Sequence, residues 1–416
     1  MFPFYYQDNQ LFCEQVALAD VVAAVGTPVY VYSETELVAR ARAYVTAVSP
    51  TNTPTNTLAC YAVKANGNVH LLRLLGQAGL GADVTSGGEL FLAQQAGISA
   101  SKTIFSGVGK TAAEIEMALR AGIRALHVES EMELTAVSAI AAKLQTKAHI
   151  GIRVNPNISA ETHPYISTGQ HSHKFGVPWA RAQAMFAAAA QHDWLEPVGI
   201  AAHIGSQIRD VDPFRQAAVF LTEVADELKA QGIALHYVDV GGGLGIDYTG
   251  EGAPEIEAWI TAVSEPVQAA GYELVLEPGR SIVGPAGALL TQVVYTKDQG
   301  QKRFVIVDAG MNDLLRPTLY KAYHPILPLQ QSNALTQNVD IVGPICESGD
   351  WLAQERPLPP QQPGDVLAIL QAGAYGFAMG SNYNGRLRPA ELLISGSQYR
   401  LIRQRQQYSH LLDGTN

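Results

Sequence analysis

The sequence has few cysteines, no long apolar run and no basic run, and each absence removes a class of protein. Three widely spaced cysteines in 416 residues (Cys13, Cys60 and Cys346) provide no disulfide framework and suggest a reducing compartment. No apolar run approaches the roughly 20 residues of a membrane span, and Met1–Tyr5 lacks the features of a signal peptide. The net charge of −10 without a basic cluster argues against nucleic acid or an anionic membrane as a partner. We therefore expect a soluble, cytoplasmic protein that acts on a small molecule.

What is present indicates a large globular enzyme. A chain of 416 residues is too long for one compact core, so two domains are expected. The hydrophobic fraction of 47% and the charged fraction of 16% are typical of a well-packed protein.

The first of these domains is predicted to span residues 29–280. Short apolar strands alternate there with alanine-rich helical stretches such as Ser86–Ala96, which starts with a capping serine, and Ala112–Arg120. Eight β-α steps with right-handed crossovers favour an α/β fold, a (β/α)8 TIM-like barrel, over the competing doubly wound open sheet. The predicted barrel strands are Leu58–Val63, Gly81–Val84, Thr103–Phe105, Ala125–Val128, His149–Val154, Val198–Ala202, Tyr237–Val240 and Glu273–Leu276.

The second domain is predicted to span residues 281–416 and to be all β, as a sandwich or a barrel. Helical periodicity fades after residue 280, and turn signals such as Gln362–Asp365 separate short β-like runs. Residues 1–28 are expected to join this domain, because Leu11–Leu18 does not fit the barrel cycle. The predicted strands are Leu289–Tyr295, Arg303–Val307, Val339–Val342, Val366–Leu370 and Glu391–Ile394.

Lys64 is the most informative residue of the chain. It ends the apolar segment Leu58–Val63, which is predicted to be a buried strand, and Ala65–Asn68 follows at once. A lysine in apolar surroundings loses its preference for the ammonium form and becomes a nucleophile, as Schiff-base chemistry with an aldehyde cofactor requires. The alternative is a lysine that merely ends a strand and extends its amine to water.

Other polar groups are predicted at the same end of the barrel. Barrel enzymes carry their active sites at the C-terminal ends of the strands, so the residues that follow each strand are candidates. These are Asp83–Ser86 after strand two, Arg153–Asn155 after strand five, His203–Ser206 after strand six, Gly241–Gly245 after strand seven and Glu277–Arg280 after strand eight.

The glycine run after strand seven favours an anion site. Gly242 and Gly243 let backbone N–H groups approach a phosphate closely, and barrel phosphate sites usually lie after this strand. The alternative is a tight turn alone. The run is not a dinucleotide fingerprint, because no glycine motif with a following acidic residue accompanies strand one.

Glu277 and His203 each have two interpretations. Glu277 either pairs with Arg280 as a structural ion pair or faces a pyridine nitrogen and keeps it protonated, which favours loss of carbon dioxide from a substrate Cα. His203 is either a satisfied core histidine or a ring that stacks on the face of a cofactor.

Two further clusters lie in the β region. Arg316 and Tyr320 stand four residues apart, on one face if the stretch is helical, and an arginine binds a carboxylate through a bidentate fork. Cys346 and Glu347 lie in the loop Cys346–Asp350, where a thiol and two acids surround a glycine.

No metal site is expected. No Cys or His pairs show the spacing of zinc ligands, and the close pair His171 and His173 stands alone.

Together these motifs resemble the pyridoxal-phosphate-dependent decarboxylases with the alanine-racemase-like fold. The resemblance covers nearly the whole chain, and no key position departs from the pattern. The matching segments are Tyr61–Asn66, Thr162–Gly169, His173–Gly176, His203–Ser206, Glu277–Arg280, Cys346–Asp350 and Ala374–Gly376.

The resemblance implies a role for each candidate residue. Lys64 would hold pyridoxal 5′-phosphate through a Schiff base, with His203 on the ring and Glu277 at the ring nitrogen. Cys346 would return a proton to Cα, and with Glu347, a ligand of the distal amine, it would come from the partner subunit of a homodimer. The implied cofactor-binding residues are Lys64, Asp83, His203, Ser206, Gly242, Gly243, Glu277, Gly279, Arg280 and Tyr375, and the implied substrate-binding residues are Arg280, Arg316, Tyr320, Glu347 and Tyr375.

The expected reaction is decarboxylation of meso-2,6-diaminopimelate to L-lysine, the last step of lysine biosynthesis. A buried Arg316 would be costly in an ornithine or lysine decarboxylase, whose substrate has no second carboxylate. A decarboxylase of D-ornithine, D-lysine or another diamino acid is the near alternative. A racemase of this fold places arginine at the pyridine nitrogen, where this chain has Glu277. A catalytically dead homologue that binds a partner protein would not need both Lys64 and Cys346.

Overall fold

The computed structural model describes residues 3–46, 57–158 and 174–415, which divide into two compact units. The barrel unit comprises residues 40–246 and 253–281, and the β unit comprises residues 1–39, 247–252 and 282–416. The motif Thr162–Gly169, the pair His171 and His173, and the loop Ser159–Gln170 lie outside the described residues.

The barrel unit contains a closed barrel of eight parallel strands, which confirms the predicted fold class. Each strand pairs with the next along the chain, and β12 closes the ring by pairing with β5. The strands are β5 (Thr57–Ala62), β6 (Gly81–Val84), β7 (Thr103–Phe105), β8 (Ala125–Val128), β9 (Ala148–Arg153), β10 (Leu195–Ala201), β11 (Tyr237–Asp239) and β12 (Glu273–Leu276). All eight predicted strands are therefore confirmed to within a few residues.

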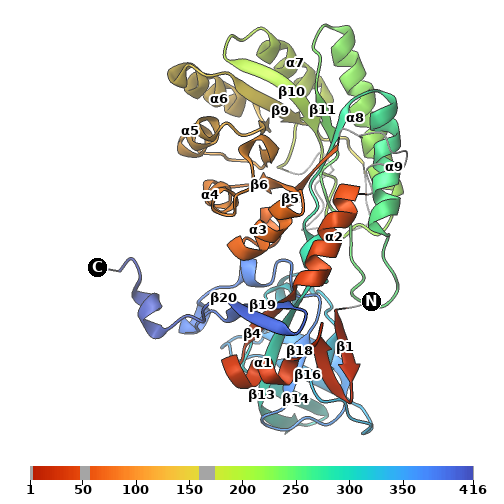
Figure 1. Cartoon of the computed structure of the whole chain (residues 1–416), viewed down its shortest axis with the longest axis vertical. Coiled ribbons are helices and arrows are strands. Elements are labelled where there is room, and N and C mark those ends of the chain that lie inside the picture. Colours follow the sequence, from red (N-terminus) through yellow and green to blue (C-terminus); the bar gives the residue numbers. More distant parts are fainter. Residues whose placement is uncertain (1–2, 47–56, 159–173, 416) are drawn as a thin grey trace. The chain divides into compact units, whose positions relative to one another are not determined.

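Helices follow the strands around the outside of the barrel (Figure 1). Their starts obey local capping rules: the Ser86 hydroxyl accepts from the Glu89 N–H, and Thr111 and Glu114 form a complete capping box. The helices are α2 (Glu34–Thr46), α3 (Val69–Gln77), α4 (Gly87–Gln95), α5 (Ala112–Ala121), α6 (Glu131–Leu144), α7 (Trp179–Ala190), α8 (Asp212–Ala230), α9 (Ile256–Ala269) and the short α10 (Arg280–Val283).

The barrel interior combines an apolar layer with a polar pair. Leu58, Cys60, Ile104 and Val275 belong to a buried cluster. The rings of His127 and Tyr237 pack against the small residues Gly151 and Gly199 and share a 2.9 Å hydrogen bond. A Cβ on Gly199 would stand 2.1 Å from the Tyr237 ring, so only glycine leaves space for this pair.

The β unit is built on a large mixed sheet in the order β17-β16-β14-β13-β4-β19-β20, with β18 pairing both β13 and β15. A separate sheet holds the N-terminal strands β1, β2 and β3. The bounds are β1 (Phe4–Gln7), β2 (Gln10–Cys13), β3 (Val16–Ala17), α1 (Leu18–Val25), β4 (Val29–Ser33), β13 (Gly287–Gln299), β14 (Lys302–Val307), α11 (Arg316–Tyr320), β15 (Ile326–Pro328), β16 (Gln337–Val342), β17 (Trp351–Leu358), β18 (Val366–Ile369), β19 (Ala390–Ser395) and β20 (Gln398–Arg403).

Strand β4 (Val29–Ser33) belongs to this sheet, although residues 29–280 are predicted from the sequence to form the barrel domain. It pairs antiparallel with β13 and parallel with β19. All five of its residues are buried, so the run lacks the alternation that would distinguish a barrel strand from a central strand of another sheet.

Among the described residues, no helix is both long and apolar enough to cross a membrane. Cys13, Cys60 and Cys346 are all free thiols, the first two buried and the third exposed.

Candidate active site

The candidate site in the barrel unit lies at the C-terminal ends of the strands, where parallel pairing brings all eight ends to one mouth. Lys64 follows β5 in a short 3-10 turn, and its Nζ stands 2.7 Å from Oδ2 of Asp83 in β6. The Lys64 side chain is 36% exposed, whereas Asp83 is fully buried. The Lys64 amine thus faces the Asp83 carboxylate.

The ion pair governs the charge of Asp83. Burial is the largest single effect and would raise the pKa of this carboxyl, but the charge and hydrogen bond of Lys64 together with the Ser106 hydroxyl hold the pKa below its ordinary value. Asp83 therefore carries a negative charge at neutral pH, and it keeps the Lys64 amine at a fixed place in the mouth.

Glu277, directly after β12, is a buried acid in a negative environment. Its Oε1 accepts a 3.1 Å hydrogen bond from the Ser106 hydroxyl. Burial raises the pKa of Glu277 well above its ordinary value, and the carboxylates of Asp83 and Asp239 raise it further. Burial likewise raises the pKa of Asp239 to about 7, although its Oδ1 accepts from the Gly241 N–H. A cationic ligand group beside Glu277 would remove the cost of ionising it.

His203, two residues after β10, is held as a neutral imidazole. Its Nδ1 accepts a 3.2 Å hydrogen bond from the backbone N–H of Gly242, so the ring proton is on Nε2. Burial lowers the pKa of His203 to about 3, which agrees with this tautomer. The ring is therefore oriented by the glycine loop and presents no charge to a ligand.

The glycine loop packs against two other strand ends. Gly243 has φ +111°, and a Cβ there would stand 2.1 Å from the carbonyl oxygen of Gly205. A Cβ on Gly242 would stand 1.9 Å from the carbonyl oxygen of Glu277, and one on Gly279 would stand 3.0 Å from the Ala62 Cβ. Only glycine allows the loops after β10, β11 and β12 to approach this closely.

Arg280 and Ser206 meet beside the close-packed glycines Gly242, Gly243 and Gly279, which we call the glycine cradle. The Arg280 guanidinium donates a 3.0 Å hydrogen bond to the Ser206 hydroxyl. A cation and a hydroxyl beside close-packed glycine backbone form a donor set suited to a phosphate. Together with the Lys64 amine and the buried Glu277, these groups fit a phosphorylated pyridine aldehyde.

Three polar residues of this mouth were not predicted from the sequence: Ser106, His127 and Asp239. Ser106 follows β7 directly, so extending the strand-end rule to strands three and four would have found it. His127 lies inside β8, and no local signal shows that its Nδ1 comes within 3.4 Å of the Ser106 hydroxyl.

One nitrogen of His127 and one oxygen each of Asp239 and Glu277 lie within 4.8 Å of one another, a grouping that a metal ion could use. Each of these three side chains also forms one hydrogen bond within the protein, His127 with Tyr237, Asp239 with the Gly241 N–H and Glu277 with Ser106. Burial lowers the pKa of His127 to about 3, so its ring is neutral.

The remaining predicted residues belong to the β unit. Arg316 is buried and begins α11, which ends with Tyr320, so the predicted helical spacing of the two is confirmed. Tyr375 is half-buried with φ 57°.

Cys346 and Glu347 are exposed and are held by the neighbouring segment Tyr383–Asn384. The Cys346 N–H donates to Asn384 Oδ1 at 2.8 Å, and the Tyr383 hydroxyl donates to the Glu347 carboxylate. Asp350 anchors the other end of this loop, because its carboxylate accepts from the N–H groups of Met311 and Ile345.

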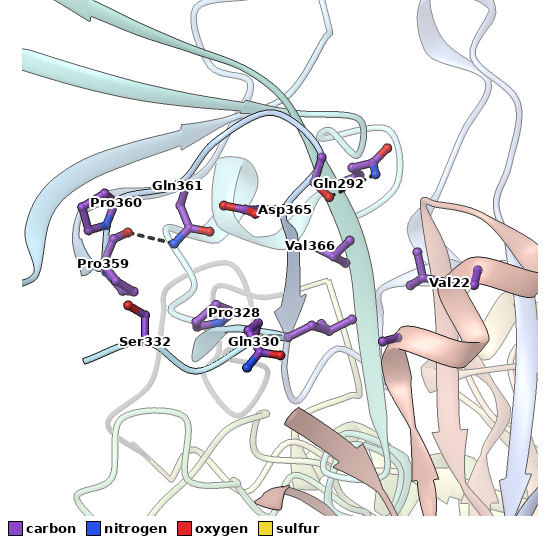
Figure 2. Close-up of a pocket in the computed structure, with 14 residues that line it drawn as sticks. Val22, Gln292, Pro328, Gln330, Ser332, Pro359, Pro360, Gln361, Asp365 and Val366 are labelled. Atoms are coloured by element: carbon purple, nitrogen blue, oxygen red, sulfur yellow. Dashed lines mark hydrogen bonds between the residues drawn. The ribbon is translucent and has the colours of Figure 1, made fainter. Parts of the chain in front are cut away.

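A pocket of about 450 Å³ in the β unit lies apart from all of these residues. Figure 2 shows Pro359, Pro360 and Gln361 on one side and Val22 of α1 on the other. Asp365 is the one ionisable residue among those that line it. The residues that line this pocket include no lysine, arginine, histidine or cysteine, so it is not a candidate for the catalytic chemistry.

The chain is similar to proteins of one described family. Residues 34–284 match the family described as pyridoxal-dependent decarboxylase, pyridoxal binding domain. The chain is 46% identical to a diaminopimelate decarboxylase of Aquifex aeolicus, over 98% of this chain and 96% of the relative. It is 47% identical to one of Neisseria meningitidis serogroup B, over 95% of this chain and 94% of the relative.

The fold is similar to that of a diaminopimelate decarboxylase of Helicobacter pylori solved with L-lysine. The TM-score is 0.91 at 43% identity, and the match covers 95% of this chain and 98% of that one.

Proposed function

Because the chain belongs to the diaminopimelate decarboxylase family of pyridoxal-dependent decarboxylases, we propose that it converts meso-2,6-diaminopimelate to L-lysine and carbon dioxide. The observation that carries the proposal is the barrel mouth, where the Lys64 amine, the neutral His203 ring and the buried Glu277 acid surround a glycine cradle. This set of groups suits a pyridoxal-phosphate decarboxylase.

In this proposal the residues of the mouth bind the cofactor. Lys64 would hold the cofactor through its aldehyde, and Glu277 would face the ring nitrogen and keep it protonated. When bound, the cofactor supplies an electron sink that stabilises the negative charge left on the substrate Cα. The residues that would hold the cofactor phosphate are Ser206, Gly242, Gly243, Gly279, Arg280 and Tyr375.

His203 supports this arrangement through its neutral charge. Its Nδ1 is engaged by the Gly242 N–H, so the ring cannot rotate freely, and we assign it to the face of the cofactor ring. Because the His203 imidazole would be uncharged, the positive charge of the cofactor would lie at its pyridine nitrogen, where Glu277 would compensate it.

Substrate selection is assigned to Arg280, Arg316 and Tyr320, which bind the second carboxylate of the substrate. Arg316 is only 5% exposed, and a buried guanidinium is costly unless an anion or polar partners compensate it. A substrate with carboxylates at both ends supplies such an anion, whereas ornithine and lysine do not.

Cys346 and Glu347 are assigned to the active site of the partner subunit of a homodimer. Both residues are exposed in the single chain, and hydrogen bonds hold the Cys346 backbone N–H and the Glu347 carboxylate in place. In the proposed dimer the Cys346 thiol returns a proton to Cα after carbon dioxide has left, and Glu347 binds the distal amine. The small-molecule reaction and the reduced cysteines also favour a cytoplasmic location.

A carbon dioxide release assay with added pyridoxal phosphate tests the function directly. We expect release from meso-2,6-diaminopimelate to exceed release from D-lysine, D-ornithine or L-ornithine by at least about a hundredfold in kcat/KM, the scale set by loss of a charge-assisted contact. Faster release from a monocarboxylic diamino acid would contradict the proposal and favour the alternative decarboxylases.

Replacing Arg316 with alanine should raise KM for diaminopimelate by about 10- to 100-fold, because a charge-assisted hydrogen bond to the substrate is lost. The residual turnover of D-lysine, which has no second carboxylate, should change by less than about threefold. Steady-state carbon dioxide release measures both values. Arg303→Ala, which removes an exposed arginine paired with Asp298, is the matched control. Equal losses of activity toward diaminopimelate and D-lysine would reject the assignment of Arg316 to the second carboxylate.

A further inference from the structure

His324 is a fully buried histidine in the β unit, eight residues after Arg316. The helix α11 ends at Tyr320, and the left-handed conformation of the next residue, Lys321 (φ 52°), reverses the chain, so that His324 returns toward the start of the helix. Its Nε2 then stands 2.7 Å from NH1 of Arg316.

The other ring nitrogen of His324 is held by the sheet. His324 precedes β15, and Leu370 follows β18, with which β15 pairs antiparallel. The Leu370 N–H donates to the Pro325 carbonyl at 2.8 Å, and His324 Nδ1 stands 2.9 Å from the Leu370 carbonyl oxygen. The register of two strands therefore sets the position of the imidazole.

These two contacts determine the tautomer. A carbonyl oxygen only accepts, so Nδ1 of His324 carries the ring proton and donates it to Leu370. A guanidinium only donates, so Nε2 carries the lone pair and accepts from Arg316. The imidazole is thus neutral, with its acceptor directed at the guanidinium.

Tyr248 contacts the same guanidinium from another direction. The Arg316 Cζ lies 4.9 Å from the centre of the Tyr248 ring, and the Tyr248 and His324 rings meet edge to face with centroids 5.2 Å apart. An aromatic face and an imidazole acceptor together restrict both the tilt and the in-plane rotation of the Arg316 fork.

We infer that His324 is a positioning residue that orients Arg316 for a substrate carboxylate and thereby contributes to the selection of substrates with a carboxylate at the distal end. This inference rests on the proposed function, in which Arg316 binds that group. A neutral acceptor suits the task, because an aspartate or glutamate at this place would orient the guanidinium but also cancel the charge that attracts the substrate.

Two substitutions of His324 distinguish the roles of its two ring nitrogens. His324→Asn keeps a donor for the Leu370 carbonyl but removes the acceptor that faces Arg316, whereas His324→Gln can present an amide oxygen at the Nε2 position. The cofactor-loaded enzyme is titrated by calorimetry with L-lysine, which retains one carboxylate, and with 1,5-diaminopentane, which has none.

We expect His324→Asn to weaken L-lysine binding by about tenfold, the effect of losing one hydrogen bond to a charged group. Binding of 1,5-diaminopentane should change by less than about twofold, and His324→Gln should restore L-lysine binding to within about threefold of the wild type. A thermal unfolding scan of each variant confirms that it is folded.

The inference would be overturned if His324→Asn bound L-lysine as tightly as the wild type, or if its affinities for L-lysine and 1,5-diaminopentane fell equally. These results are separate from a failure of the proposed function, which would appear as no carbon dioxide release from diaminopimelate by the wild-type enzyme.

Discussion

Lys64→Ala is expected to lower carbon dioxide release by about 10⁴-fold or more, the scale of removing a covalent nucleophile. The same variant should lose the visible absorbance of lysine-bound pyridoxal phosphate, because the amine that is proposed to bond to the cofactor is removed. The substitution also leaves the fully buried Asp83 without its 2.7 Å partner. We expect it to lower the free energy of unfolding by about 2–3 kcal/mol, at the low end for a broken buried pair because the lysine is partly exposed.

Lys64→Arg is the control that separates the chemistry from the ion pair. The guanidinium keeps a positive charge near Asp83 but does not form a Schiff base at neutral pH. We expect this variant to regain most of the thermal stability and none of the activity or absorbance. Lys102→Ala, an exposed lysine of the same barrel unit, should behave like the wild type. A Lys64→Ala enzyme that still absorbs in the visible after cofactor loading would refute the assignment.

Mixing inactive Lys64→Ala with inactive Cys346→Ala subunits should restore activity. In a heterodimer with shared sites, one site contains both substitutions and the other contains an intact Lys64 from one subunit and an intact Cys346 from its partner. Purified heterodimers should therefore reach about half of the wild-type rate. The measurement is carbon dioxide release by heterodimers isolated through two different affinity tags.

The Cys346→Ala parent is expected to lose about 10²- to 10⁴-fold in rate, as for removal of a general acid. A mixture of Lys64→Ala with Lys64→Arg should show no recovery, because no site then has a lysine. Heterodimers of Lys64→Ala and Cys346→Ala that stay inactive would place Lys64 and Cys346 of one subunit in the same site.

The barrel was predictable because its strands are short apolar runs separated by helices with local start signals. Ser86 caps α4 as the sequence indicates, and Thr111 also caps α5. Once eight parallel strands are expected, the strand-end rule places Lys64, His203 and Glu277 at one mouth without further information. The same rule was available for Ser106, which was missed because strand three was not considered.

The sequence by itself determined the barrel, its catalytic end and most candidate residues, because periodicity, capping and strand ends are local properties of the chain. Only the tertiary structure decided that Lys64 faces Asp83, that β4 joins the sheet of the β unit, and that His324 meets Arg316. Each of these depends on which distant segments pair, and no local pattern encodes a register between two strands. Charge compensation and tautomers follow from those pairings, so the electrostatics of the site became visible only in the folded chain.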